Sequence, residues 1–299
     1  MDPELEAFLA LFPPAQLRDP IAERKNFAEL AAAIPVPDTS GIDIEDRIVP
    51  ADPDVPVRIY RPHGAEAAIV WLHGGGFVMG DLDTEHPWAV RIADGSGVTV
   101  ISVGYRLAPE NPFPAALDDA YAVLKWTAEH AVELGVDPAR IAVGGHSAGG
   151  GLAAALALRA RDDHGPAIYF QLLNQPGLDD RQETWSARTF TDTPWMNRDK
   201  VSHSWQHYLG GASATPYAAP SRATDLSGLP PTYIATAEFC PNRDEGLDYA
   251  MRLLRSGVPV EAHQWSGTFH GSQAILSAEV SQRQLAEVAA VLRRAMTAQ

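Results

Sequence analysis

Residues 141–161 read IAVGGHSAGGGLAAALALRAR, and this stretch decides the fold. The apolar start predicts a short buried strand over residues 141–145, and the Ala- and Leu-rich remainder predicts a helix over residues 148–161. Between them lies GHSAG, a Gly-x-Ser-x-Gly pattern in the strand–turn–helix context of a nucleophile elbow. Its glycines give the backbone room for a turn that lifts the Ser147 hydroxyl above the sheet. Ser147 is the candidate nucleophile; the alternative is a glycine-rich turn in which Ser147 only caps the helix.

Outward from this stretch, strand patterns alternate with helix patterns. Continuous apolar runs suit strands buried on both faces of a parallel sheet. Strands are expected at residues 42–49, 55–60, 67–72, 98–103, 167–173, 231–237 and 258–265. Helices are expected at residues 88–94, 115–134, 246–255 and 282–296. The alternation predicts an α/β fold with a mostly parallel sheet and helices on both faces.

Two segments stand outside this alternation. Residues 1–40 read as helical, with Leu5, Phe8, Leu9 and Phe12 at helical spacing. Residues 178–213 carry several aromatic side chains in polar sequence and show no strand pattern. An insertion after a sheet strand can cover a ligand site at the carboxyl edge. The predicted organisation is an N-terminal helical cap segment (1–40) and a main domain (41–299) with a helical cap insertion at about 178–213.

Composition excludes several functions. Lys and Arg number 23 and Asp and Glu 38, so the net charge of −15 disfavours a nucleic-acid partner or a polybasic membrane surface. One cysteine cannot form an internal disulfide, and no run is apolar enough for a membrane span. The acidic N-terminus lacks the pattern of a signal peptide. A cytoplasmic location is the expectation.

A second glycine-rich stretch, HGGGF at residues 73–77, follows a predicted strand. Consecutive glycines let backbone N–H groups point into a cavity with no Cβ in the way, which suits an oxyanion hole. The alternatives are a phosphate-binding loop or a plain turn. A Walker loop fails because no Gly-Lys-Ser/Thr follows, and the spacing of a dinucleotide-binding loop is absent.

Several motifs together resemble the hormone-sensitive lipase family of α/β-hydrolases, including its microbial esterases. They are HGGGF (73–77), YRLAPE (105–110), GHSAGG (145–150), DLSGLPP (225–231), RDEG (243–246) and FHG (269–271). The resemblance covers roughly residues 42–296. It implies an α/β-hydrolase fold, with a mostly parallel eight-stranded sheet, a helical cap, and carboxylic ester hydrolysis without metal or cofactor. It also implies that the N–H groups of Gly75, Gly76 and Ala148 bind the oxyanion. The family usually has Asp where this chain has His146.

His270 is the candidate base. It lies in a loop between the last predicted strand and the last predicted helix, and the order nucleophile, acid, base fits the α/β-hydrolase pattern. A neutral imidazole can take the serine proton and return it to the leaving alcohol. His203 and His207, at i and i+4, suit a metal on one helical face, but no third ligand is evident, so no metal site is expected.

The acid departs from the family motif, because Cys240 occupies the slot of the catalytic Asp in EFCPNRDE, residues 238–245. A thiol has an ordinary pKa near 8.5 and does not supply the missing charge. The first hypothesis is a replacement carboxylate, Glu238 ahead of Asp244, with Asp179 as an outside candidate. The second is a Ser147–His270 pair, with Cys240 or a water molecule against the imidazole. The third is impaired catalysis.

These residues predict a serine carboxylesterase acting on small, fairly apolar esters through an acyl-enzyme. The candidates for lining the substrate pocket are Phe77, Trp185, Trp195 and Trp205. The alternatives are a small-molecule-binding protein on an impaired hydrolase scaffold, and an amidase or deacetylase using the same serine and histidine. The expected partner is a small-molecule ester. Homo-oligomerisation is possible, and the sequence decides neither it nor the acyl length.

Overall fold

A single eight-stranded sheet organises the chain. The computed structural model describes residues 1–11 and 17–297. Its strands are β1 (Ile42–Val49), β2 (Val55–Pro62), β3 (Ala68–Leu72), β4 (Thr99–Val103), β5 (Ile141–His146), β6 (Phe170–Asn174), β7 (Thr232–Phe239) and β8 (Val260–Phe269). Their order is β1-β2-β4-β3-β5-β6-β7-β8, in which β2 is antiparallel to both neighbours and the pairs from β4 to β8 are parallel. The predicted fold class, an α/β-hydrolase fold with a mostly parallel sheet, is confirmed.

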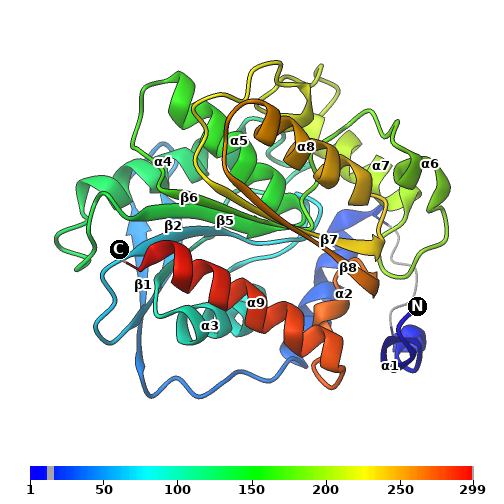
Figure 1. Cartoon of the computed structure of the whole chain (residues 1–299), viewed down its shortest axis with the longest axis horizontal. Coiled ribbons are helices and arrows are strands. Elements are labelled where there is room, and N and C mark those ends of the chain that lie inside the picture. Colours follow the sequence, from blue (N-terminus) through cyan, green and yellow to red (C-terminus); the bar gives the residue numbers. More distant parts are fainter. Residues whose placement is uncertain (12–16, 298–299) are drawn as a thin grey trace.

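Helices cover both faces of the sheet. They are α1 (Pro3–Glu6), α2 (Pro20–Ala32), α3 (Leu82–Ser96), α4 (Ala115–Glu129), α5 (Ala148–Asp162), α6 (Trp185–Thr189), α7 (Arg198–Leu209), α8 (Arg243–Arg255) and α9 (Glu279–Met296). Short 3-10 turns occupy Leu9–Leu11, Pro220–Arg222 and Ser272–Ala274. Helices α4, α5 and α8 lie on one face, and α3 and α9 lie on the other (Figure 1). The strands β3, β4 and β5 are buried on both faces, because a separate apolar cluster packs on each side.

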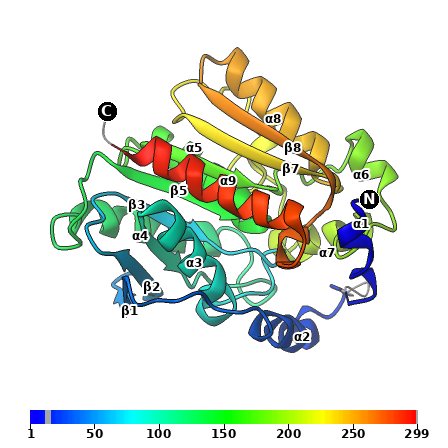
Figure 2. The ribbon, with the colours of Figure 1, turned by 60° about the horizontal axis from the view of Figure 1, so that its bottom comes forward.

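The segments expected to form a cap gather at one end of the sheet. Helices α1 and α2 come from the N-terminal segment and α6 and α7 from the insertion, and both views place them on the same side of the molecule (Figures 1 and 2). Phe12, which contributed to the helical prediction, lies outside the described residues. Arg24 of α2 donates to the carbonyls of Val78 and Ala108 and pairs with Glu110 at 2.6 Å, so α2 is fixed to the loops after β3 and β4.

Among the predicted helices, two differ most from their bounds in the structure. The helix expected at residues 88–94 begins at Leu82, because Asp81 and Thr84 form a reciprocal capping box and the helix continues through Pro87. The helix expected at 115–134 ends at Glu129. None of the helices among the described residues combines the length and the apolarity needed to cross a bilayer.

Candidate active site

Ser147 stands in a strained turn between β5 and α5. Its φ of 57° and ψ of −119° are unusual for a residue with a side chain. The turn depends on its flanking glycines: a Cβ on Gly145 would lie 2.5 Å from the Leu72 carbonyl oxygen, and one on Gly149 would lie 1.9 Å from it. The Ser147 amide donates to the Asn174 carbonyl at 2.9 Å. The backbone is therefore held in the conformation that the elbow pattern predicts.

The glycine loop after β3 provides amide groups beside this serine. Gly75 and Gly76 have φ of 121° and 63°, and both line the cavity in front of Ser147. Their N–H groups have no hydrogen-bond acceptor among the described residues, whereas the Gly75 carbonyl accepts from Val78 and Met79. Ala148 begins α5, where the first amides of a helix are free of intrahelical partners. These three amides have the character of an oxyanion hole.

His270 follows β8, and its loop is fixed from both sides. The neighbouring Gly271 amide donates to Gln175 Oε1 at 3.0 Å, and Gln175 Nε2 donates to Gln273 Oε1 at 3.1 Å. Gln273 in turn lies 3.3 Å from the His146 ring nitrogens. A glutamine pair thus ties the His270 loop to the end of β6 and to the elbow.

The structure brings Ser147 and His270 together and places Cys240 behind them. His270 Nε2 lies 2.8 Å from Ser147 Oγ, and His270 Nδ1 lies 3.1 Å from Cys240 Sγ. All three side chains are buried. The group against the second imidazole nitrogen is therefore the thiol in the slot where the family motif has Asp.

The two favoured replacement carboxylates lie elsewhere, contrary to the sequence-based expectation. Glu238 accepts from the Gly267 amide at 2.7 Å, and β7 ends at Phe239, so the strand alternation that would align residues 238 and 240 does not extend to Cys240. Asp244 accepts from the Ser186 amide at 2.8 Å.

The remaining carboxylate and histidine candidates also have other contacts. Asp179 pairs with Arg181 at 2.7 Å. His203 and His207 contact the backbone carbonyls of Asp199 and Leu17, respectively.

Burial sets the charge state of the site. It raises the pKa of the Cys240 thiol to about 12, so the thiol is neutral at pH 7. It also holds the pKa of His270 well below the ordinary value, and the neighbouring His146 ring and the Lys200 ammonium act in the same direction. Burial likewise lowers the pKa of His146 to about 4. At neutral pH the site therefore holds an uncharged imidazole between an uncharged hydroxyl and an uncharged thiol.

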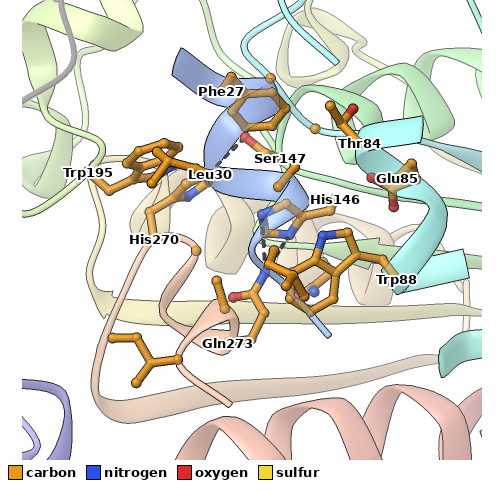
Figure 3. A pocket seen from close by; sticks show the side chains of 18 of the residues that line it. Phe27, Leu30, Thr84, Glu85, Trp88, His146, Ser147, Trp195, His270 and Gln273 are labelled. Carbon is orange, nitrogen blue, oxygen red and sulfur yellow. Dashed lines mark hydrogen bonds between the residues drawn. The ribbon is translucent and has the colours of Figure 1, made fainter. Parts of the chain in front are cut away.

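A cavity of about 440 Å³ opens onto Ser147. Its walls are mainly apolar and come from α2, α3, the insertion and the segment after β8. Figure 3 shows Trp195 and His270 on one side of Ser147 and Glu85 and Trp88 on the other, with Phe27 close to the serine. A ligand carbonyl at Ser147 would thus have pocket space toward both the insertion and α3.

The expected pocket residues Phe77 and Trp205 do not line this cavity. Phe77 stacks on Tyr208 with centroids 3.9 Å apart, and Trp205 packs 5.3 Å from Phe77, so both belong to the buried core that joins the glycine loop to α7. Phe27 and Trp88 line the cavity and were missed. Their aromatic character was visible in the sequence, but only packing shows which aromatic side chains face the ligand space.

Comparisons with known proteins agree with this geometry. A family model described as the alpha/beta hydrolase fold matches residues 69–274. Esterase LipI of Mycobacterium tuberculosis is 46% identical over 230 residues, covering 74% of this chain and 72% of the relative. Carboxylesterase NlhH of the same species is 43% identical over 242 residues, covering 76% and 75%.

Solved structures extend the similarity over the whole chain. A bacterial heroin esterase aligns with a TM-score of 0.96 and 44% identity, covering 100% of this chain and 98% of the other. A thermostable esterase from Pseudomonas putida ECU1011 aligns with a TM-score of 0.93 and 33% identity, covering 99% and 98%. From the elbow, the glycine loop and these relatives together, the chain belongs to the hormone-sensitive lipase family of α/β-hydrolases, in its microbial carboxylesterase branch, and is a carboxylic ester hydrolase.

Proposed function

We propose that Ser147 is the nucleophile and His270 the base in the hydrolysis of small, fairly apolar esters. The observation that carries this assignment is the 2.8 Å contact between His270 Nε2 and Ser147 Oγ at a strained elbow. Ser147 Oγ attacks the ester carbonyl carbon while its proton passes to Nε2. The proton then moves to the leaving alcohol as the C–O bond breaks and an acyl-enzyme remains. Water, deprotonated by the same imidazole, hydrolyses that intermediate.

The proposed oxyanion donors are the amides of Gly75, Gly76 and Ala148. Negative charge develops on the carbonyl oxygen only in the tetrahedral transition state, so donors fixed beforehand stabilise it without reorganisation. Each such donor is worth roughly 3–4 kcal/mol of transition-state stabilisation. Substitution at Gly75 would disturb this loop, because a Cβ there would lie 2.2 Å from the Met79 carbonyl oxygen.

Cys240 takes the place of the triad carboxylate as a neutral positioning residue. For Nε2 to accept the serine proton, the imidazole must carry its own proton on Nδ1. Cys240 Sγ, 3.1 Å away, then accepts a weak hydrogen bond from Nδ1–H through a sulfur lone pair. A thiol that donated to Nδ1 would favour the wrong tautomer. The proposed site is a Ser147–His270 pair oriented, but not electrostatically assisted, by Cys240.

The cavity supports the proposed substrate class. Its volume of about 440 Å³ and mainly apolar lining suit acyl and alcohol groups of a few carbon atoms each rather than long acyl chains. Trp195 and Met196 on the insertion side would bound one group, and Trp88 on α3 the other.

Covalent labelling and burst kinetics test the proposal. A p-nitrophenyl short-chain ester should release p-nitrophenol in a burst, and a fluorophosphonate should add one adduct to the intact protein. Ser147→Ala should lose both, and the exposed control Ser227→Ala should retain both. A Ser147→Ala protein that still turns over the ester at the original rate would remove Ser147 from the mechanism. The matched p-nitroanilide shows whether amides are also cleaved.

A further inference from the structure

The catalytic cavity contains a buried carboxyl group that the proposed mechanism does not use. Glu85 lies on α3, is 7% exposed and lines the cavity. Its Oε1 accepts from the indole Nε1 of Trp71 at 2.6 Å, and its Oε2 has no hydrogen bond among the described residues. Figure 3 places Glu85 across the pocket from His270. In this position the Glu85 carboxyl group faces the part of the cavity that a substrate would occupy, and not the Ser147 hydroxyl.

No basic side chain of the described residues pairs with Glu85. The two cationic side chains that line the cavity have other contacts. Arg91 donates to the Pro87 carbonyl at 3.1 Å and lies over the Trp88 ring at 5.9 Å. Lys200 donates to the Trp195 carbonyl on the insertion side. Burial without a cation raises the pKa of Glu85 to about 8, so the empty site holds it mostly protonated near pH 7.

The groups around Glu85 indicate which chemical class of ligand it would bind. The cavity wall near it includes the indole rings of Trp71 and Trp88, and a carboxyl oxygen without a partner in such a wall suits a cationic donor such as an ammonium ion. A bound ammonium would lower the pKa of the carboxyl group, which would release its proton to solvent and form a charge-assisted hydrogen bond. A neutral apolar group at the same place would leave a buried polar atom without a partner, which is unfavourable.

We propose that Glu85 is a specificity-determining residue that selects esters carrying a basic amine on the group that extends toward α3. This inference rests on the proposed function, since it concerns the same cavity. It adds a substrate class, aminoalkyl esters, that neither the apolar lining nor the catalytic residues indicate.

Matched ester pairs test the inference. Each pair consists of an ω-(dimethylamino)alkyl acetate and the isosteric acetate in which CH replaces N, with spacers of two to six methylenes. The measured quantity is the ratio of kcat/KM for the amine to kcat/KM for its isostere at pH 7. For at least one spacer the ratio should exceed about 10, which is the ratio expected from the free energy of one charge-assisted hydrogen bond.

Two variants separate the role of Glu85 from general charge effects. Glu85→Gln keeps the shape and the acceptor for Trp71 but cannot ionise, so the ratio should fall to near 1. Because the resting acid is mostly neutral, this variant should fold like the parent. The control Asp83→Asn removes an exposed carboxylate two residues away on the same helix and should leave the ratio unchanged.

Ratios near 1 for every spacer, or a ratio that survives Glu85→Gln, would overturn the inference while leaving ester hydrolysis intact. If none of these acetates is turned over, calorimetric titration of Ser147→Ala with the same pairs decides. Preferential binding of the amines that Glu85→Gln abolishes supports the inference, and equal binding refutes it. Failure of the proposed function is seen separately, as loss of fluorophosphonate labelling.

Discussion

Replacing Cys240 with Asp should make the enzyme faster. The thiol lies 3.1 Å from His270 Nδ1 and is neutral, so nothing on that side stabilises the imidazolium that forms when Ser147 gives up its proton. The Asp side chain places a carboxylate oxygen where the sulfur now lies, with almost the same reach from the backbone. Once ionised, this new carboxylate would favour the Nδ1–H tautomer and attract the developing positive charge.

The size of the effect follows from the distance. Two unit charges about 4 Å apart attract by about 4 kcal/mol at an effective dielectric constant of 20. Burying a new carboxylate offsets part of this gain, and Glu245, a buried acid nearby, adds to that cost. A net stabilisation of about 1.5–3 kcal/mol remains, which corresponds to an increase in kcat of about 10- to 150-fold.

The assay is the pH dependence of kcat/KM for a p-nitrophenyl ester in the parent and in Cys240→Asp. In the parent, burial keeps the pKa of His270 well below the ordinary value, so kcat/KM should stay level as pH falls through 6.5 and decline only at lower pH. A carboxylate stabilises the protonated imidazole, so the declining limb should move to higher pH in the variant as the plateau rises.

Cys240→Asn is the matched control, because its side chain has the shape of Asp without the charge. It should show no gain, and its amide N–H can donate to Nδ1 and lower the rate through the wrong tautomer. The thermal transition shows whether Cys240→Asp is folded. If the folded variant has the same rate and the same pH dependence as Cys240→Asn, the reasoning about charge at this position is refuted.

Two further substitutions test parts of the site that the sequence alone left open. Glu238→Gln should change kcat/KM by less than about threefold and lower the free energy of unfolding by about 1 kcal/mol, because Glu238 accepts from the Gly267 amide and does not contact His270. A loss of kcat/KM of about 100-fold would show that Glu238 takes part in the mechanism. Gly149→Ala should lower the unfolding free energy by about 3 kcal/mol or more, because the new Cβ would lie 1.9 Å from the Leu72 carbonyl oxygen. Denaturant unfolding of both variants gives these values, and Gly41→Ala, with no atom within 4 Å of the added Cβ, is the control for the glycine substitution.

The sheet, the elbow and the His270 loop could be predicted because local sequence determines them. The apolar run before Ser147 and the glycines around it dictate a strand that ends in a cramped turn, and the structure shows both. His270 was found from its place after the last strand. Such features depend on neighbours in the chain, where composition and periodicity carry information.

The sequence left the partner of His270 open, with Cys240 as the second hypothesis behind a carboxylate, and it did not predict the cavity walls. The prediction for Glu238 assumed that the strand alternation reaches Cys240, but β7 ends at Phe239 and the extra residues of the irregular β7–β8 pairing lie in β8. The prediction for Phe77 and Trp205 treated aromatic character as a sign of ligand contact, although their rings pack on each other in the core between the glycine loop and α7. Phe27 reaches the cavity because α2 is held on the glycine loop through Arg24, a contact between distant segments.

The neutral thiol fits a site that carries little charge at rest. A buried carboxylate is stable only with a cation or several donors beside it, and the His270 imidazole is kept neutral mainly by burial, with the neighbouring His146 and Lys200 acting in the same direction. Cys240 avoids an unpaired buried charge in the resting state, whereas the usual triad carboxylate is compensated only when the imidazole becomes protonated. In this site the imidazolium of the transition state then has its main counter-charge in the oxyanion itself. The rate should therefore depend more strongly on the donors of the glycine loop than in a triad that contains Asp, and the base should remain active at lower pH.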